Sequence, residues 1–122
     1  MTSDGREGGV LIVDAANVVG SVPDGWWRDR RGAAERLRDL LAARNEGEEI
    51  ILVVEGAARG VESVPGVRVD SAPGSGDDRI VELAAAHADR GCVVVTADRE
   101  LRERVRAYGV RCVGPRTVRP AD

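Results

Sequence analysis

Short hydrophobic runs that end in an acidic residue recur along the chain. They are residues 10–13 before Asp14, residues 50–54 before Glu55, and residues 93–97 before Asp98. Continuous runs rich in β-branched residues are typical of strands that are buried on both faces of a parallel sheet. In such sheets, ligands bind beyond the carboxyl ends of the strands, where the strand order reverses. We therefore expect these acids to meet at one edge of the fold, although they are far apart in sequence.

Helices are expected between these strands, because apolar residues there recur at helical spacing with charged residues on the other face. The helices are predicted at residues 33–41, 77–88 and 98–108. The second of them follows a segment rich in turn-forming residues, Ser71-Ala72-Pro73-Gly74-Ser75-Gly76. Residues 15–31 are predicted to form a loop, since they contain the turn sequence Val-Pro-Asp-Gly at 22–25.

The order of these elements predicts the fold class. Strands are expected at residues 9–14, 49–55, 67–70, 92–97 and 110–113. Their alternation with helices indicates a three-layer α/β/α sandwich around a mainly parallel, five-stranded sheet. Right-handed crossovers give the strand order 3-2-1-4-5. We expect one domain over residues 9–115, between a flexible N-terminal tail at 1–8 and a C-terminal tail at 116–122.

Composition narrows the possible chemistry. All 18 basic residues are Arg, and the chain has no Lys. A Walker A loop and Schiff-base catalysis both need a Lys and are therefore excluded. The net charge of −3 argues against non-specific coating of duplex DNA, but it does not exclude nucleic acid, because local charge distribution decides such binding.

Cysteine, histidine and hydropathy patterns exclude further classes. Cys92 and Cys112 fit no zinc motif, and we expect them to be small buried residues in a reducing compartment. The single histidine, His87, cannot form a zinc triad. No apolar run is long enough to span a membrane, and the first residues lack a signal-peptide pattern. We therefore expect a cytoplasmic protein without a membrane partner.

Several carboxylates in one crevice would repel each other unless a cation held them together, so the pattern favours a divalent-metal site. The candidate ligands are Asp14, Glu55, Asp77, Asp78 and Asp98. Taken singly, an acid at a helix start is an ordinary cap, but capping alone hardly explains so many at the expected switch point. Mg²⁺ or Mn²⁺ held by acids lowers the pKa of a water molecule and stabilises phosphoryl charge, which suits phosphodiester hydrolysis.

Three segments resemble the NYN and PIN-like nuclease domains. They are residues 10–19, with an Asp and then an Asn after the first strand, residues 76–82, with an acidic helix start, and residues 93–100, with a hydroxyl and an acid after a late strand. The resemblance covers nearly the whole chain in the right order. It implies a metal-dependent ribonuclease with Asp14, Asp78 and Asp98 as core acids.

The same resemblance gives roles to neighbouring residues. It implies that Asn17 and Asp77 are further catalytic residues and that Thr96 occupies the hydroxyl position of the substrate site. Glu55 is a departure, because related domains often carry Asp or a neutral residue there; we expect a secondary ligand or a group that positions water. A nucleotide or phosphate-ester hydrolase, or a non-catalytic RNA-binding module, would be compatible with the same fold.

The segment around two adjacent tryptophans is the best candidate for contact with RNA. An indole of Trp26 or Trp27 could stack on a base, while Arg28 and Arg30 meet phosphates. The alternative is structural: one Trp plugs the sheet edge, and the Arg residues pair with neighbouring acids. Further candidates for substrate contact are Arg59 and Arg99. A homodimer or an inhibitory protein partner is left open by the sequence.

Overall fold

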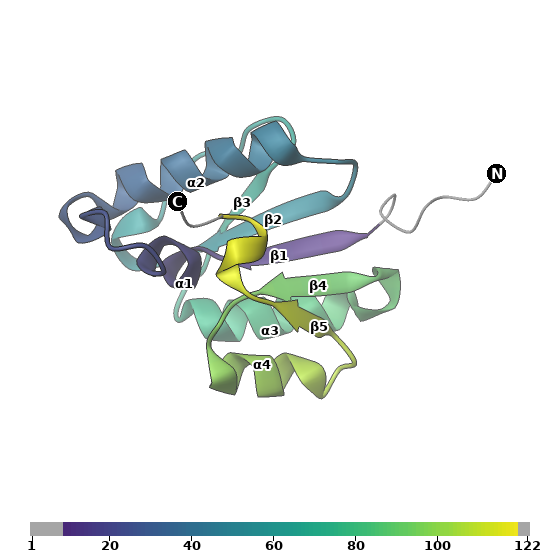
Figure 1. The fold of residues 1–122 in the computed structure, drawn as a ribbon. Coiled ribbons are helices and arrows are strands. Elements are labelled where there is room, and N and C mark those ends of the chain that lie inside the picture. Colours follow the sequence, from purple (N-terminus) through teal and green to yellow (C-terminus); the bar gives the residue numbers. More distant parts are fainter. Residues whose placement is uncertain (1–8, 120–122) are drawn as a thin grey trace.

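A five-stranded parallel sheet forms the centre of the molecule, seen here in a computed structural model that describes residues 9–119 (Figure 1). The strands are β1 Val10–Asp14, β2 Glu49–Val54, β3 Arg68–Ser71, β4 Cys92–Val95 and β5 Arg111–Val113. Their order is β3-β2-β1-β4-β5, and every pair of neighbours runs parallel. The predicted strand order is therefore confirmed.

Helices cover both faces of this sheet (Figure 1). They are α1 Ala15–Gly20, α2 Arg30–Arg44, α3 Gly76–Ala86 and α4 Arg99–Arg106, with short 3-10 segments η1 Trp26–Arg28, η2 Gly56–Ala58, η3 Ala88–Arg90 and η4 Pro115–Thr117. Side chains of β1 alternate between the two faces: Val13 packs with α1 and α2, whereas Ile12 packs with α3 and α4. The three-layer α/β/α sandwich is thus confirmed. None of the helices within residues 9–119 is long and apolar enough to cross a membrane.

The segment predicted as a loop at residues 15–31 contains a helix. α1 begins directly after β1, because the Asp14 side chain accepts a hydrogen bond from the Asn17 backbone N–H and caps the helix. Val18 is fully buried on this helix. The turn sequence at 22–25 favoured a loop, but tertiary burial of the residues before it outweighs this weak local preference.

The predicted C-terminal tail is partly wrong. Val118 is 1% exposed and packs into the core beside α1 and α2. The guanidinium of Arg119 donates to the Val19 carbonyl and pairs with Asp24, in the segment between α1 and η1. Residues 116–119 therefore belong to the domain, whereas residues 1–8 and 120–122 lie outside the described part of the chain. A single apolar residue among polar ones gave no periodicity from which to predict this packing.

Candidate active site

Asp14, at the carboxyl end of the central strand β1, is buried to 7% exposure. Its Oδ2 accepts a hydrogen bond from the Thr96 hydroxyl at 2.9 Å, and its Oδ1 accepts the longer bond from the Asn17 N–H at 3.4 Å. Burial raises the pKa of this carboxyl to about 6, and the negative charges of Asp77 and Glu55 raise it further against the lowering effect of the two donors. The carboxylate is therefore held ionised at neutral pH only at a cost in free energy.

Two further carboxylates, Asp77 and Glu55, lie near Asp14, and Asp98 lies near Asp77. The four together are called the acidic edge: Asp14, Glu55, Asp77 and Asp98. Partial burial raises the pKa of Asp77, and the charges of Asp98 and Glu55 add to this effect, while Arg104 opposes it. These residues come from the ends of β1 and β2 and from the starts of α3 and α4. The order of the parallel strands thus brings acids that are far apart in sequence to one edge of the sheet, as expected.

Asp78 does not join this group. Its carboxylate, 69% exposed, forms an ion pair with Arg104 at 2.9 Å. Successive residues on a helix are about 100° apart, so only one of two adjacent acids can face the sheet edge. The Ser75 side chain accepts from the Asp78 N–H and caps α3 in the phase that turns Asp77 inward. Asp77 therefore lies with the acidic edge, in the place that we expected for the core acid Asp78.

The acids do not form a ready-made metal site. No group of three Asp, Glu, His or Cys side chains in the described part of the chain is arranged so that it could hold a metal ion as it stands. The expected convergence of Asp14, Asp78 and Asp98 into one metal site is therefore not found in this arrangement. Two of the acids have local partners instead: Asp98 caps α4 by accepting from the Leu101 N–H at 3.0 Å, and Asp78 pairs with Arg104.

The residue types of the acidic edge nevertheless fit a hard divalent cation. All its side-chain donors are carboxylate oxygens, which Mg²⁺ and Mn²⁺ prefer. The raised pKa values of Asp14 and Asp77 mark repulsion that a cation would relieve. Small movements of the Glu55, Asp77 and Asp98 side chains, with Asp14 fixed, would be needed to bring their oxygens to a common ion.

Glu55 is held in place by the start of α3. Its Oε1 accepts a hydrogen bond from the Gly76 backbone N–H, and a Cβ built on Gly76 would lie 2.5 Å from that oxygen. A methyl group at this position would displace the end of the Glu55 side chain and break the hydrogen bond.

We expect Gly76→Ala to destabilise the protein by about 1 kcal/mol, although alanine is the better helix former, because the hydrogen bond to Glu55 is lost. Urea unfolding at pH 7.5 measures this. Gly74→Ala is the matched control, since a Cβ at Gly74 meets nothing within 4 Å. In a Glu55→Ala background the cost of Gly76→Ala should vanish; an unchanged cost would contradict the explanation.

Thr96 and Asn17 make hydrogen bonds that fix the surroundings of Asp14 and Asp98. The Thr96 side chain is 0% exposed, donates to Asp14 and accepts from the Asp98 N–H at 3.1 Å. The Asn17 side-chain oxygen accepts from the Ala97 N–H at 2.8 Å and so joins α1 to the β4–α4 connection. In this structure the buried Thr96 hydroxyl positions the Asp14 carboxylate and the Asp98 backbone, and its expected contact with substrate stays a prediction.

The two tryptophans differ in their surroundings. Trp26 is partly buried against the core, whereas Trp27 is 50% exposed; their rings meet edge to face with centroids 5.9 Å apart. Arg28 lies over the Trp27 ring at 5.7 Å and Arg30 over the Trp26 ring at 5.4 Å. The structural interpretation thus fits Trp26, while Trp27 is free to contact a ligand.

The acids on either side of the two tryptophans, Asp24 and Asp29, have other partners. Asp24 pairs with Arg119, and Asp29 accepts from the Gly32 N–H at 2.9 Å as the cap of α2. The alternative in which Arg28 and Arg30 pair with these acids is therefore not found among residues 9–119.

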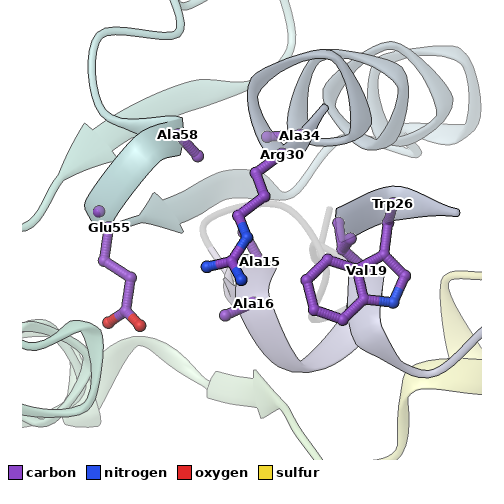
Figure 2. Close-up of a pocket in the computed structure, with 9 residues that line it drawn as sticks. Ala15, Ala16, Val19, Trp26, Arg30, Ala34, Glu55 and Ala58 are labelled. Atoms are coloured by element: carbon purple, nitrogen blue, oxygen red, sulfur yellow. The ribbon is translucent and has the colours of Figure 1, made fainter. Parts of the chain in front are cut away.

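A pocket of about 160 Å³, called here the Trp26 pocket, separates this loop from the acidic edge (Figure 2). It is lined by Ala15, Ala16, Val19, Trp26, Arg30, Ala34, Glu55, Gly56 and Ala58. Figure 2 shows the Arg30 side chain pointing into the space between Glu55 and the Trp26 ring. Glu55 therefore belongs both to the pocket and to the acidic edge.

The other two candidate arginines, Arg59 and Arg99, do not line the Trp26 pocket. Arg59 donates to the Pro73 carbonyl at 3.1 Å and so connects η2 with the loop before α3. Arg99 is exposed at the start of α4, beside Asp98. Both remain predictions as contacts for substrate phosphate.

The fold matches the α/β fold of PIN-like domains: a parallel 3-2-1-4-5 sheet flanked by helices. The chain is similar to Rae1 (YacP) from Bacillus subtilis, seen in the crystal structure of a single-substitution variant, with a TM-score of 0.67 and 22% identity over 88% of this chain and 69% of that one. No protein-family model and no curated protein sequence matches the chain.

Proposed function

We propose that this protein is a ribonuclease that depends on Mg²⁺ or Mn²⁺ and hydrolyses phosphodiester bonds of RNA at the acidic edge. The observation that carries the proposal is Asp14, a buried carboxylate with a pKa of about 6 that faces two further acids at the carboxyl end of a parallel sheet. The PIN-like fold and the resemblance of three segments to NYN and PIN-like nucleases support it.

In this proposal the residues have distinct tasks. Asp14, Asp77 and Asp98 hold the cation, with Glu55 beside them. The cation, when bound, lowers the pKa of a water molecule and neutralises charge on phosphoryl oxygens. Thr96 holds the Asp14 carboxylate, and the Asn17 side chain holds the backbone just before Asp98, so both are positioning residues.

The chain also offers contacts for the RNA strand. Arg99, at the start of α4, provides positive charge for a phosphate beside Asp98. The exposed Trp27 ring provides a surface on which a base can stack. Neither residue supplies a metal ligand, so both would act on binding of the strand.

The experiment that tests this function offers the protein labelled RNA, single-stranded DNA and free nucleotides, each with Mg²⁺, Mn²⁺ or EDTA. We expect cleavage of RNA that requires the metal. Hydrolysis of nucleotides alone would favour a phosphate-ester hydrolase instead. Binding of RNA without cleavage under every condition would favour a non-catalytic module and overturn the proposal.

Adjacent acids provide a matched pair for the same assay. We expect Asp77→Asn to lower cleavage by about a hundredfold or more, because loss of partners that only support metal ligands already costs about 10- to 100-fold. Asp78→Asn removes the same charge one residue away but leaves the acidic edge intact, so its effect should be several times smaller. Equal losses in the two variants would contradict the placement of Asp77 as a ligand.

A further inference from the structure

The Trp26 pocket lies next to the acidic edge, yet most of its lining is apolar. Its floor is made by small side chains, among them Ala15 and Ala16, which follow Asp14 directly. The indole of Trp26 forms one wall (Figure 2). A ligand in this pocket would therefore lie beside the acidic edge, because Glu55 belongs to both.

The dimensions of the pocket limit what it can hold. An apolar cavity of about 150 Å³ holds one benzene molecule, and pockets for drug-sized ligands measure about 300–1,000 Å³. At about 160 Å³, and partly open, the Trp26 pocket admits a single planar ring system. A flat aromatic wall beside small side chains suits stacking of such a ring.

Arg30 defines the chemistry of the ligand. Its guanidinium lies 5.4 Å from the Trp26 ring centre, and it makes no hydrogen bond or ion pair with another residue of the described part. A guanidinium carries only donors, so the ligand must present acceptors to it. The pocket thus combines a stacking surface with a free planar donor group.

We propose that the Trp26 pocket binds one nucleobase of the RNA strand, with guanine preferred. Guanine presents two adjacent acceptors, O6 and N7, which an Arg guanidinium contacts in a bidentate manner, the commonest specific contact between Arg and a base. The base stacks on Trp26, and its nucleotide flanks the phosphate at the acidic edge. This inference rests on the proposed function, because it takes RNA as the substrate.

Binding of mononucleotides tests the pocket without any cleavage. In a Trp27→Phe variant, Trp26 is the only tryptophan of the chain, so its fluorescence reports on stacking. We expect GMP in EDTA to quench this fluorescence and to bind about tenfold more tightly than AMP, CMP or UMP. Inorganic phosphate alone should not quench it. Equal binding of all four nucleotides would overturn the preference for guanine.

Two pairs of variants locate the binding. Ala16 is an exposed residue of the pocket, so Ala16→Leu fills the pocket without disturbing the core; Ala57→Leu is its control, since Ala57 is exposed on the neighbouring η2 but does not line the pocket. We expect Ala16→Leu to weaken GMP binding by about tenfold, as loss of one stacked base would. Ala57→Leu should leave it unchanged.

Arg30→Met should also weaken GMP binding by about tenfold and abolish the preference over AMP, whereas Arg36→Met, an exposed Arg on the same helix, should do neither. Loss of binding in Arg30→Met but not in Ala16→Leu would identify a phosphate contact and overturn the base pocket. RNA cleavage is measured separately. GMP binding without RNA cleavage would contradict the proposed ribonuclease function but support the base pocket. RNA cleavage without any base preference in binding would support the function but contradict the base pocket.

Discussion

Asp14→Asn is expected to abolish RNA cleavage while stabilising the metal-free protein at neutral pH. The folded protein raises the pKa of Asp14 from its ordinary value of 3.8 to about 6. A shift of this size corresponds to about 3 kcal/mol of unfavourable free energy for the ionised form. The neutral amide removes this cost but accepts hydrogen bonds less well from Thr96 and Asn17, so we expect a net gain of about 1–2 kcal/mol.

The sign of this effect fixes its pH dependence. Because the folded pKa lies above the unfolded one, the folded protein binds the proton more tightly, and its stability falls as the pH rises from about 4 through about 6. The gain in stability from Asp14→Asn should therefore be full above pH 7 and absent below about pH 4. Urea unfolding in EDTA across this range measures it.

Adding Mg²⁺ or Mn²⁺ should narrow the difference in the free energy of unfolding between Asp14→Asn and the wild type, because the ion stabilises the wild-type protein and not the variant. Destabilisation by Asp14→Asn at pH 8 in EDTA would instead mean that this carboxylate mainly caps α1. Such a result would remove the main support for a metal site at the acidic edge.

Thr96→Val is expected to have the largest effect on stability. Valine keeps the shape of the side chain but removes a buried hydroxyl that donates to Asp14 and accepts from the Asp98 N–H. At pH 7.5 the loss leaves a buried carboxylate without its shorter hydrogen bond, which we expect to cost about 2–4 kcal/mol. The pKa of Asp14 should rise above its present value of about 6, since a donor that lowers it is gone.

Thr96→Ser is the matched control, because serine keeps the hydroxyl and loses only a buried methyl group, at a cost of about 1 kcal/mol. Chemical denaturation measures both variants, and NMR titration of the Asp14 carboxyl measures the shift in pKa. In an Asp14→Asn background, the penalty of Thr96→Val should shrink. A Val variant as stable as the Ser variant would show that the hydroxyl does not support Asp14.

The fold could be predicted from sequence because its signals are local and consistent. Runs buried on both faces read as continuous apolar segments, and β1 and β4 are such runs. Right-handed crossovers then leave few topologies, so the position of Asp14 at the central switch point followed from strand order alone.

The parts that sequence could not predict depend on tertiary contacts. Which of Asp77 and Asp78 faces the sheet depends on the residue at which α3 begins. The Ser75 cap fixes that residue, because its side chain accepts from the Asp78 N–H. The Trp26 pocket exists because small residues from separate elements, such as Ala16 and Ala58, meet at one place. No pattern along the chain shows that they do so.

The bond between Thr96 and Asp14 spans 82 positions of the chain, and the pair of Arg119 and Asp24 spans 95. Synthesis begins at the N-terminus, so β1 emerges first and must wait for β4 before both its edges are paired. A nascent chain therefore carries Asp14 well before it carries Thr96, whose hydroxyl holds the carboxylate in place. The proposed site at the acidic edge is therefore complete only once β4 has paired with β1 in the sheet.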